Sequence, residues 1–244
     1  MKKFFLFAAA VATALTINAQ EKVVKVITDY ANYIEFQALM ADPAIKDATI
    51  NSENPLELPN GAVINGYKKA DETEAECKWN AKEDYNTTWW IADGLDGVDS
   101  LTVGTQLRAA SGCSIAFGDF ETSAAGKVYV YYQLNGDDSS KQGENVRGVS
   151  LTIGSADPVE YRFATAKNCC VAKFDLPAGT YDAGDLVLKV LKNTINIAGI
   201  RIDNMGAQAV NNTNAAVKAE KFFRNGQLII RKNGVEYNAL GAQL

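Results

Sequence analysis

The titratable side chains of this 244-residue chain permit a narrow range of catalytic chemistry, because the chain contains no histidine. Histidine is the side chain that ordinarily titrates near neutral pH, so Ser-His-Asp, Cys-His and histidine-metal sites are all excluded. Chemistry based on an Asp/Glu pair, as in glycoside hydrolysis, or on a lysine or tyrosine base remains open. The 29 acidic residues form no distinctive motif. The sequence therefore favours a non-enzymatic protein, with a carboxylate-dependent, glycan-active enzyme as the alternative.

Four cysteines are the remaining reactive side chains: Cys77, Cys113, Cys169 and Cys170. They allow three disulfide connectivities, and the sequence does not choose among them. Cys169 and Cys170 are adjacent, so on a strand their side chains would point to opposite faces. No spacing forms a C-x-x-C pair, and a zinc site in a chain without histidine would be Cys-only and non-standard. No metal or other cofactor is therefore expected from these residues.

The first nineteen residues have the three zones of a secretory signal peptide. Lys2 and Lys3 are followed by an apolar run from Phe4 to Leu15, and Ala19 precedes the expected cleavage point. The run is about twelve residues long, whereas a membrane-spanning helix needs about twenty, so no membrane span is expected. An exported chain reaches an oxidising compartment. We therefore predict at least one intramolecular disulfide, with Cys169 and Cys170 not bonded to each other.

The charge of the chain is negative and unevenly distributed. The formal net charge is −5, and removal of Lys2 and Lys3 makes it more negative. The residues from Lys218 to the end carry more basic than acidic side chains, so the body is more acidic than the whole. An acidic body repels phosphate backbones and anionic membrane surfaces. Nucleic acid is therefore not an expected partner.

The body, residues 20–205, is patterned mostly with a period of two. Val128, Val130, Tyr132 and Leu134 alternate with other residues in one run, which ends at the turn signal Asn135-Gly136. Similar short runs lie at 148–155, 158–164, 170–176 and 185–192. Runs that start about eight to twelve residues apart are typical of an antiparallel sandwich rather than of βαβ units. We predict an all-β fold, an antiparallel β-sandwich or jelly roll.

Three stretches depart from this alternation. The stretch 28–43 begins with the capping candidates Thr28 and Asp29, carries apolar residues at helical spacing and ends at Pro43, so it predicts one short N-terminal helix. The apolar positions of 194–203 change phase, which predicts a β-bulge at Ala198–Gly199. The charged run 68–78 is interpreted as a solvated loop.

The order of elements from about Glu21 to Asn204 resembles that of secreted jelly-roll, galactose-binding-like modules associated with polysaccharide-degrading enzymes. The resemblance rests on the opening "ITDY…F" segment, the string of strands, "LPAGTYDAGDLVLKV" and the closing "INIAGIRI". It implies binding of carbohydrate or another cell-surface ligand. Some such modules hold calcium through a Glu-x-Glu, and Glu74 and Glu76 have that spelling. Their position in a charged run favours solvent-facing side chains over a structural calcium site.

A carbohydrate-binding role would need a flat aromatic side chain that stacks on a pyranose ring. The candidates for ligand contact are Trp79, Trp90, Tyr129 and Tyr131. If the stretch 87–92 is a strand, Trp89 shares the face of Ile91 and Trp90 lies on the opposite, outward face. The alternative for each ring is packing in the core, where large rings contribute much of the buried area. A purely structural or adhesive role is a further alternative for the protein.

The last residues, 218–244, read as a three-stranded meander that follows a polar linker at 206–217. Its turns fall at Asn225-Gly226 and Asn233-Gly234, a pair that prefers the tight type I′ hairpin. Closing the second hairpin pairs Lys232 with Val235, Arg231 with Glu236, Ile230 with Tyr237 and Leu228 with Ala239. Local turn chemistry and side-chain pattern thus agree.

This tail resembles the C-terminal sorting tails recognised by the type IX (Por) secretion system of certain Gram-negative bacteria. The matching positions are Phe223, Asn225, Gly226, Gln227, Leu228, Ile230, Asn233, Gly234, Tyr237, Asn238 and Gly241. The resemblance implies contact with secretion machinery and a secreted or outer-surface location. If the tail is not an active sorting signal, the expected location is the periplasm.

Overall fold

The computed structural model describes the body of the protein and three strands of its tail. The described residues are 23–75, 77–80, 87–165, 168–206, 220–224, 227–232 and 235–238. The proposed signal peptide, residues 207–217 of the linker and the turns of the tail lie outside them. No helix among the described residues is long and apolar enough to cross a membrane.

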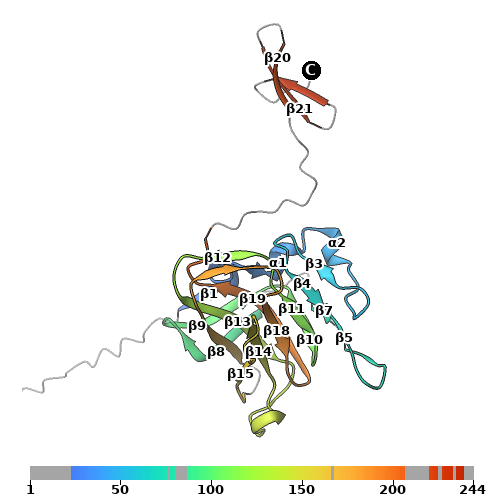
Figure 1. The fold of residues 1–244 in the computed structure, drawn as a ribbon. Coiled ribbons are helices and arrows are strands. Elements are labelled where there is room, and N and C mark those ends of the chain that lie inside the picture. The colour runs from blue at the N-terminus through green and yellow to red at the C-terminus, as the bar shows by residue number, and fades with distance from the viewer. Residues whose placement is uncertain are drawn as a thin grey trace, which may run out of the picture.

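Two mainly antiparallel sheets build most of the body (Figure 1). The first has the order β1 (Val24–Val26), β9 (Val98–Val103), β8 (Thr87–Leu95), β16 (Cys169–Leu176), β13 (Gly126–Leu134), β19 (Thr194–Ile202), β10 (Gln106–Ala110) and β7 (Cys77–Asn80), with β2 (Ile34–Glu35) also on β19. The second has the order β15 (Val159–Arg162), β14 (Gly148–Ile153), β18 (Leu186–Val190), β11 (Ser114–Ala116), β4 (Val63–Asn65) and β3 (Leu56–Glu57). Only β1–β9 and the contact of β16 with β8 are parallel among these pairs. The predicted all-β class is confirmed.

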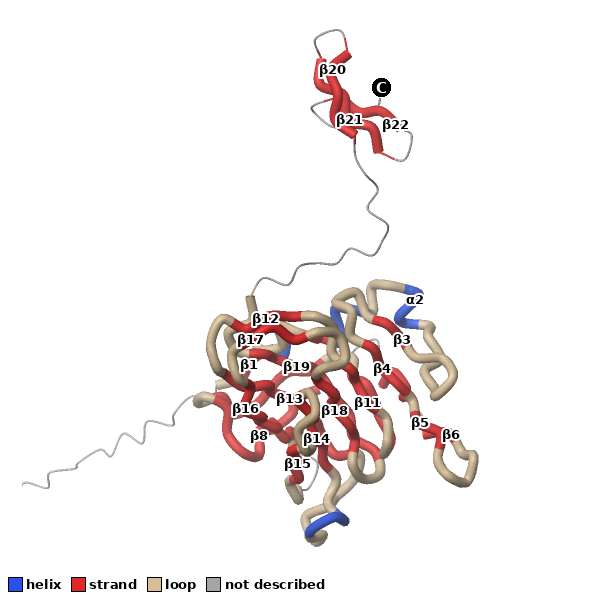
Figure 2. The backbone as a smooth tube through the Cα atoms, in the orientation of Figure 1, coloured by secondary structure: helices blue, strands red, loops and turns tan. Residues whose placement is uncertain are grey.

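Smaller elements complete the described chain (Figure 2). The two-stranded pairs are β12 (Phe120–Thr122) with β17 (Gly179–Tyr181), and β5 (Tyr67–Lys68) with β6 (Glu74–Ala75). The helical turns are the 3-10 segments η1 (Ile27–Asp29) and η2 (Gly143–Asn145), and the α-helical segments α1 (Phe36–Leu39) and α2 (Pro43–Lys46).

Strand β13 separates two apolar clusters because its side chains alternate between the faces of the sheet. Val128, Val130, Tyr132 and Leu134 are buried in the larger cluster, which includes inward residues of both sheets, such as Leu188. This is the face predicted from the alternation. The opposite face carries a second cluster, which the β8–β9 hairpin and η1 help to form: Ile27, Ala31, Trp89, Leu95, Val98, Leu101, Val103, Tyr131, Cys169, Val171 and Ala198.

A β-bulge in β19 keeps its isoleucines in the larger cluster. Tyr131 pairs with Gly199 and Tyr132 pairs with Ile197, so Ala198 has no partner on β13. Ala198 lies in the second cluster, whereas Ile197 and Ile200 lie in the larger one. A Cβ atom on Gly199 would lie 2.7 Å from the Cβ of Ala31, so this position needs glycine. The predicted bulge is confirmed at its predicted residues.

The predicted N-terminal helix is much shorter than its sequence pattern. Ile34 and Glu35 form a strand that pairs with Ile200 and Gly199 of β19, and this pairing interrupts the helical stretch. Helix α1 begins only after it, and the Glu35 carboxylate caps it by accepting hydrogen bonds from the N–H groups of Gln37 and Ala38. The predicted caps Thr28 and Asp29 lie instead in η1.

Two further expectations need correction. The charged run 68–78 contains the β5–β6 hairpin and the start of β7 rather than a plain loop, and the hairpin projects from the body (Figure 2). Val159, whose place in the alternating run 158–164 predicts an inward face, is 60% exposed. It lies on β15, an edge strand that has a neighbouring strand on one side only.

The four cysteines are buried free thiols, and none forms a disulfide in this structure. Cys169 lies in the second cluster and Cys170 in the larger one, so the adjacent side chains do occupy opposite faces of β16. Cys77 and Cys113 lie together in the larger cluster, where the Cys77 thiol donates to the Asn65 carbonyl oxygen at 3.7 Å and the Cys113 thiol donates to the Ala75 carbonyl oxygen at 3.2 Å. The predicted disulfide is thus absent here.

A buried carboxylate, Asp138, organises the connection between β13 and β14. Its side chain is fully buried, and it accepts hydrogen bonds from the Arg147 guanidinium and the Arg147 N–H at 2.8 Å each. The Lys141 ammonium is 2.5 Å from the same carboxylate. Burial alone would raise the pKa of Asp138, but these donors and their charges outweigh it, so the pKa lies below its usual range. Two cations thus compensate one buried anion.

The tail forms the predicted three-stranded meander, with β20 (Glu220–Arg224), β21 (Gln227–Lys232) and β22 (Val235–Asn238) in that order. Lys232 pairs with Val235, Arg231 with Glu236 and Ile230 with Tyr237, so the predicted register is confirmed at these positions. The predicted Leu228–Ala239 pair and both Asn-Gly turns include residues outside the described part.

Candidate functional site

An exposed tryptophan lies on the outer face of the small β1–β9–β8 layer. Trp90 is 47% exposed, whereas Trp89 is fully buried in the second cluster. The sequence therefore identified correctly which indole faces outward. Trp90 lies directly opposite Ser100, which in turn pairs with Val24 on β1. The next row on this face is formed by Thr88, Thr102 and Val26.

We call these six residues, Thr88, Trp90, Ser100, Thr102, Val24 and Val26, the tryptophan face. Val24 and Val26 are among the exposed large apolar residues of the body, as is Trp90. The face thus combines one indole with aliphatic side chains and the hydroxyl groups of Thr88 and Thr102, whereas Ser100 is fully buried. Such a surface can stack on the apolar face of a sugar ring while the threonine hydroxyls donate or accept hydrogen bonds.

The two tyrosine candidates do not present free ring faces. Tyr131 is fully buried between the central strands and the β8–β9 hairpin, and burial raises its pKa well above the usual range. Tyr131 therefore cannot serve as an exposed platform, because the hairpin covers its side of β13. Tyr129 is partly buried, and the guanidinium carbon of Arg201 lies 3.7 Å from its ring centroid. One ring face of Tyr129 is thus occupied by a cation–π contact.

Trp79 is anchored at the border between core and surface. Its Nε1–H donates a hydrogen bond of 2.8 Å to the Ile45 carbonyl oxygen, and its ring centroid lies 5.7 Å from that of Phe36. The indole also lines a cleft of about 410 Å³, which we call the tryptophan cleft. The other residues lining this cleft are Lys46, Ala48, Thr49, Ile50, Asn51, Glu74, Cys77 and Lys78.

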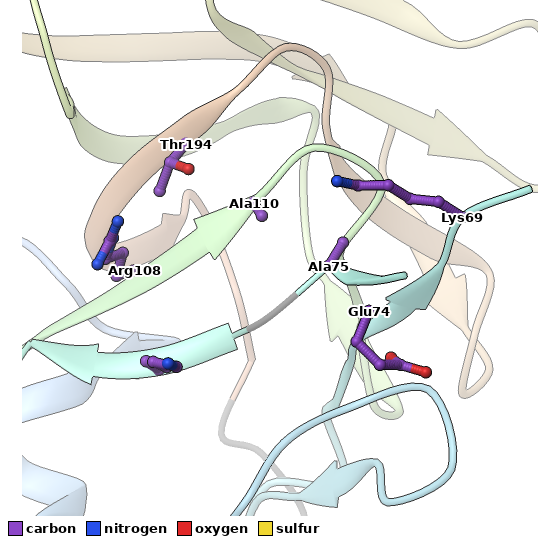
Figure 3. Close-up of a pocket in the computed structure, with 7 residues that line it drawn as sticks. Lys69, Glu74, Ala75, Arg108, Ala110 and Thr194 are labelled. Atoms are coloured by element: carbon purple, nitrogen blue, oxygen red, sulfur yellow. The ribbon is translucent and has the colours of Figure 1, made fainter. Parts of the chain in front are cut away.

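A second cleft of about 150 Å³ shares two of these residues, Glu74 and Lys78. Its lining is drawn in Figure 3 and consists of Lys69, Glu74, Ala75, Lys78, Arg108, Ala110 and Thr194. We call it the basic cleft, because three of these side chains are cationic and one is a carboxylate. Sequence reasoning missed it. The signal in the sequence was Lys78, a basic residue in the charged run. Its cross-strand partner Arg108 lies thirty residues further along the chain, so local pattern does not bring the two together.

The Glu-x-Glu considered for calcium gives no cation site in the described part of the chain. The Glu74 carboxylate accepts hydrogen bonds from the Ser52 hydroxyl at 2.7 Å and the Ser52 N–H at 3.2 Å. These hydrogen bonds lower the pKa of Glu74. Among the residues that the structure describes, no group of three or more cysteine and acidic side chains could hold a metal. Glu76 lies outside those residues.

The sorting-tail positions divide between described strands and undescribed turns. Phe223, Gln227, Leu228, Ile230, Tyr237 and Asn238 lie on the strands of the meander. The other positions lie outside the described residues: Asn225, Gly226, Asn233, Gly234 and Gly241.

Comparison with known proteins finds similar solved structures but identifies no family for this chain. No protein-family model matches the chain, and no curated protein matches its sequence. Among solved structures, the K1 adhesin domain of Lys-gingipain from Porphyromonas gingivalis W83 matches with a TM-score of 0.37 and 11% identity, over 65% of this chain and 98% of that one.

Two carbohydrate-binding modules match at similar levels. The module CBM6cm-2 of Cellvibrio mixtus lichenase 5A, solved with cellotriose, has a TM-score of 0.30 and 11% identity, over 63% of this chain and 94% of that one. The C-terminal CBM6 of a laminarinase from Zobellia galactanivorans has a TM-score of 0.28 and 13% identity, over 51% of this chain and 97% of that one. All three TM-scores are below 0.5, so the functional argument rests on the residues of this chain.

Proposed function

We propose that this protein is a non-enzymatic glycan-binding module of an exported or cell-surface protein. The observation that carries the proposal is Trp90, whose indole is half exposed on a β-surface beside the accessible threonines Thr88 and Thr102. Exposing a large aromatic ring to water forgoes the stabilisation that its burial would give. A pyranose ring would recover part of it by covering the indole, and the sugar hydroxyls would meet polar neighbours.

The lining of the clefts supports binding over catalysis. Glycoside hydrolysis requires two carboxyl groups about 5–10 Å apart that flank the scissile bond. Among the residues described as lining the tryptophan cleft and the basic cleft, Glu74 is the one carboxylate, and Ser52 holds it in a hydrogen-bonded pair. The described part of this lining therefore holds no second carboxylate of the kind that glycan cleavage would use.

A glycan array combined with a reducing-sugar release assay on the exported protein tests this proposal. We expect retention of at least one glycan class without release of reducing ends. Release of reducing ends would instead assign the carboxylate-dependent enzyme. Absence of both retention and release would leave the structural or adhesive role as the better account.

We propose that this module lies outside the cytoplasm. Residues 1–19 and the tail would direct its export. The tail's meander has the strand register expected for the sorting-like sequence, with Arg231 opposite Glu236 and Ile230 opposite Tyr237. No strand of the meander is hydrogen-bonded to a sheet of the body within the described chain. We infer that the tail is an export address that contacts secretion machinery.

Deletion of residues 218–244 should therefore change the location of the protein and not the stability of its body. A three-stranded meander this short cannot build a sizeable core, so the body should not depend on it. We expect the truncated chain to accumulate in the periplasm with the melting temperature of the full chain, measured by cell fractionation and a thermal melt. A truncated chain that still reaches the surface would refute the sorting role.

We further propose that Cys77 and Cys113 form a disulfide after export. Both cysteines line the same small apolar cavity, and the neighbouring Cys77 thiol lowers the pKa of Cys113, which favours the Cys113 thiolate as the attacking group. Oxidation would transfer two electrons and two protons from the thiols to a disulfide-bearing oxidant, such as an oxidised dithiol oxidoreductase, which becomes a dithiol.

The bond should appear as a Cys77–Cys113 cross-linked peptide in mass spectrometry of the non-reduced exported protein. Reduction should lower the free energy of unfolding by about 3–4 kcal/mol, because the bond closes a long loop in the unfolded chain. Cys169→Ser should leave the cross-link intact, whereas Cys113→Ser should abolish it. Four free thiols in the exported protein would contradict the pairing.

A further inference from the structure

We propose that the basic cleft is a second binding site, which takes the anionic group of an acidic glycan, a sugar carboxylate or sulfate ester. The inference rests on the proposed glycan-binding function but concerns residues separate from the tryptophan face. Cationic side chains of three elements converge here around a hollow: Lys69 of the loop after β5, Lys78 of β7 and Arg108 of β10. Strand β19 adds the hydroxyl-bearing Thr194.

The cleft is built by cross-strand registry. Lys78 on β7 lies directly opposite Arg108 on β10, and Arg108 lies opposite Asn196 on β19. Ala110 lies opposite Thr194 one row further along, on the same face. Figure 3 shows Arg108 and Thr194 on one side of the hollow, while the Lys69 side chain extends from the other side toward Ala110. Small side chains, Ala75 and Ala110, leave room between the cations.

Arg108 is the cation of this row that is available to a ligand. Its guanidinium makes no ion pair or side-chain hydrogen bond with the rest of the described chain. A guanidinium can hold a carboxylate or sulfate through two parallel hydrogen bonds.

Asn196 lies in the same row but is not among the residues that line the cleft. It is only 7% exposed, and its Oδ1 is buried without a hydrogen-bond partner. The assignment of the anion to a sugar therefore rests on the proposed glycan-binding function and not on Asn196.

The surroundings extend the site beyond a single charged group. The tryptophan cleft adjoins through Glu74 and Lys78, and its volume of about 410 Å³ lies within the range of small-molecule pockets. The Trp79 indole lines it. Tyr67, 43% exposed, lies opposite Ala75 and two residues before Lys69. One aromatic ring, Trp79, thus lines the cleft that adjoins the cations, whereas Tyr67 lines neither cleft.

The local positive charge does not reverse the exclusion of nucleic acid. The chain as a whole carries a net charge of −5, which repels an extended phosphate backbone. The cations of the cleft form a compact group rather than a stripe. They therefore suit one or two anionic groups on an otherwise neutral or sparsely charged ligand.

Calorimetric titration with three matched oligosaccharides tests the inference: an oligohexuronate, a sulfated oligosaccharide and an uncharged one. We expect wild-type protein to bind an anionic oligomer more tightly than the neutral one, with weakening as salt is raised. Arg108→Gln should lower the affinity for the anionic oligomer by at least about tenfold, which is the loss expected when a charged hydrogen-bonded pair is removed. Whichever anionic oligomer is preferred identifies the anion.

Control variants separate this site from the tryptophan face. Lys127→Gln removes a cation that pairs with Asp175 outside both clefts, and it should leave anionic binding unchanged. Lys78→Gln should reproduce the loss seen with Arg108→Gln, and thermal melts confirm that each variant is folded. Equal affinity for neutral and anionic oligomers, or full anionic binding by Arg108→Gln, would overturn this inference alone. Binding of no glycan at all would overturn the proposed function as well.

Discussion

Trp90→Ala should abolish glycan retention with little change in melting temperature, whereas Trp89→Ala should lower the free energy of unfolding by about 3–5 kcal/mol. The two residues are adjacent on β8 and are chemically identical, so each is the control for the other. They differ in environment: Trp89 is fully buried against Leu101, its partner on β9, and Trp90 is 47% exposed. Truncating Trp89 leaves a cavity in the second cluster, and truncating Trp90 removes a surface ring.

Affinity electrophoresis in the retained glycan and chemical denaturation of both variants provide the measurement. Because a domain is stable by only about 5–15 kcal/mol, the loss in Trp89→Ala is a large share of the total. The Trp89→Ala protein should still retain glycan under conditions where it remains folded. Equal destabilisation by both substitutions would assign Trp90 to packing and remove the observation on which the proposed function depends.

Asp138→Asn should destabilise the protein by about 3–5 kcal/mol, the cost of breaking a buried ion pair and leaving cations without their partner. The carboxylate is fully buried and receives both Lys141 and Arg147. Asp175→Asn is the matched control, because Asp175 also pairs with a lysine, Lys127, but its side chain is 90% exposed. We expect that surface substitution to change the free energy of unfolding by about 0–1 kcal/mol.

The effect of Asp138→Asn should also depend on pH in a defined direction. The pKa of Asp138 is lowered in the folded state, by the donors Lys141 and Arg147 acting against burial. Its stabilising contribution is therefore present above the unfolded value, about 3.9, and is lost as the pH falls through the lower folded value. Urea unfolding at pH 7 and in acid should show the difference between wild type and variant shrinking below about pH 4. A constant difference down to acid would contradict the ionised pair.

Local pattern in the sequence sufficed wherever the deciding interactions were close along the chain or followed from alternation. The inward face of β13, the outward position of Trp90 and the bulge at Ala198 all follow from which neighbours share a face of a strand. The register of the tail's second hairpin follows from its Asn-Gly turn, because a two-residue turn sets the pairing of the strands beside it.

Only the tertiary structure decided features that depend on segments distant in the chain. Ile34 and Glu35 leave the helical stretch because they pair with Gly199 and Ile200, a contact that no local pattern near residue 34 reveals. Tyr131 is buried because the β8–β9 hairpin covers its face, although its alternation matches that of an exposed residue.

The basic cleft shows the same limit for function. Lys78 and Arg108 are opposite each other only because β7 pairs with β10, and Asn196 joins them only because β10 also pairs with β19. Periodicity assigns each residue to a face of its own strand, whereas the order and register of strands depend on the packing of the whole sheet. The sequence by itself thus determined the all-β class and the faces of single strands. The tertiary structure decided which of those faces meet, and so which charged and aromatic side chains form a site.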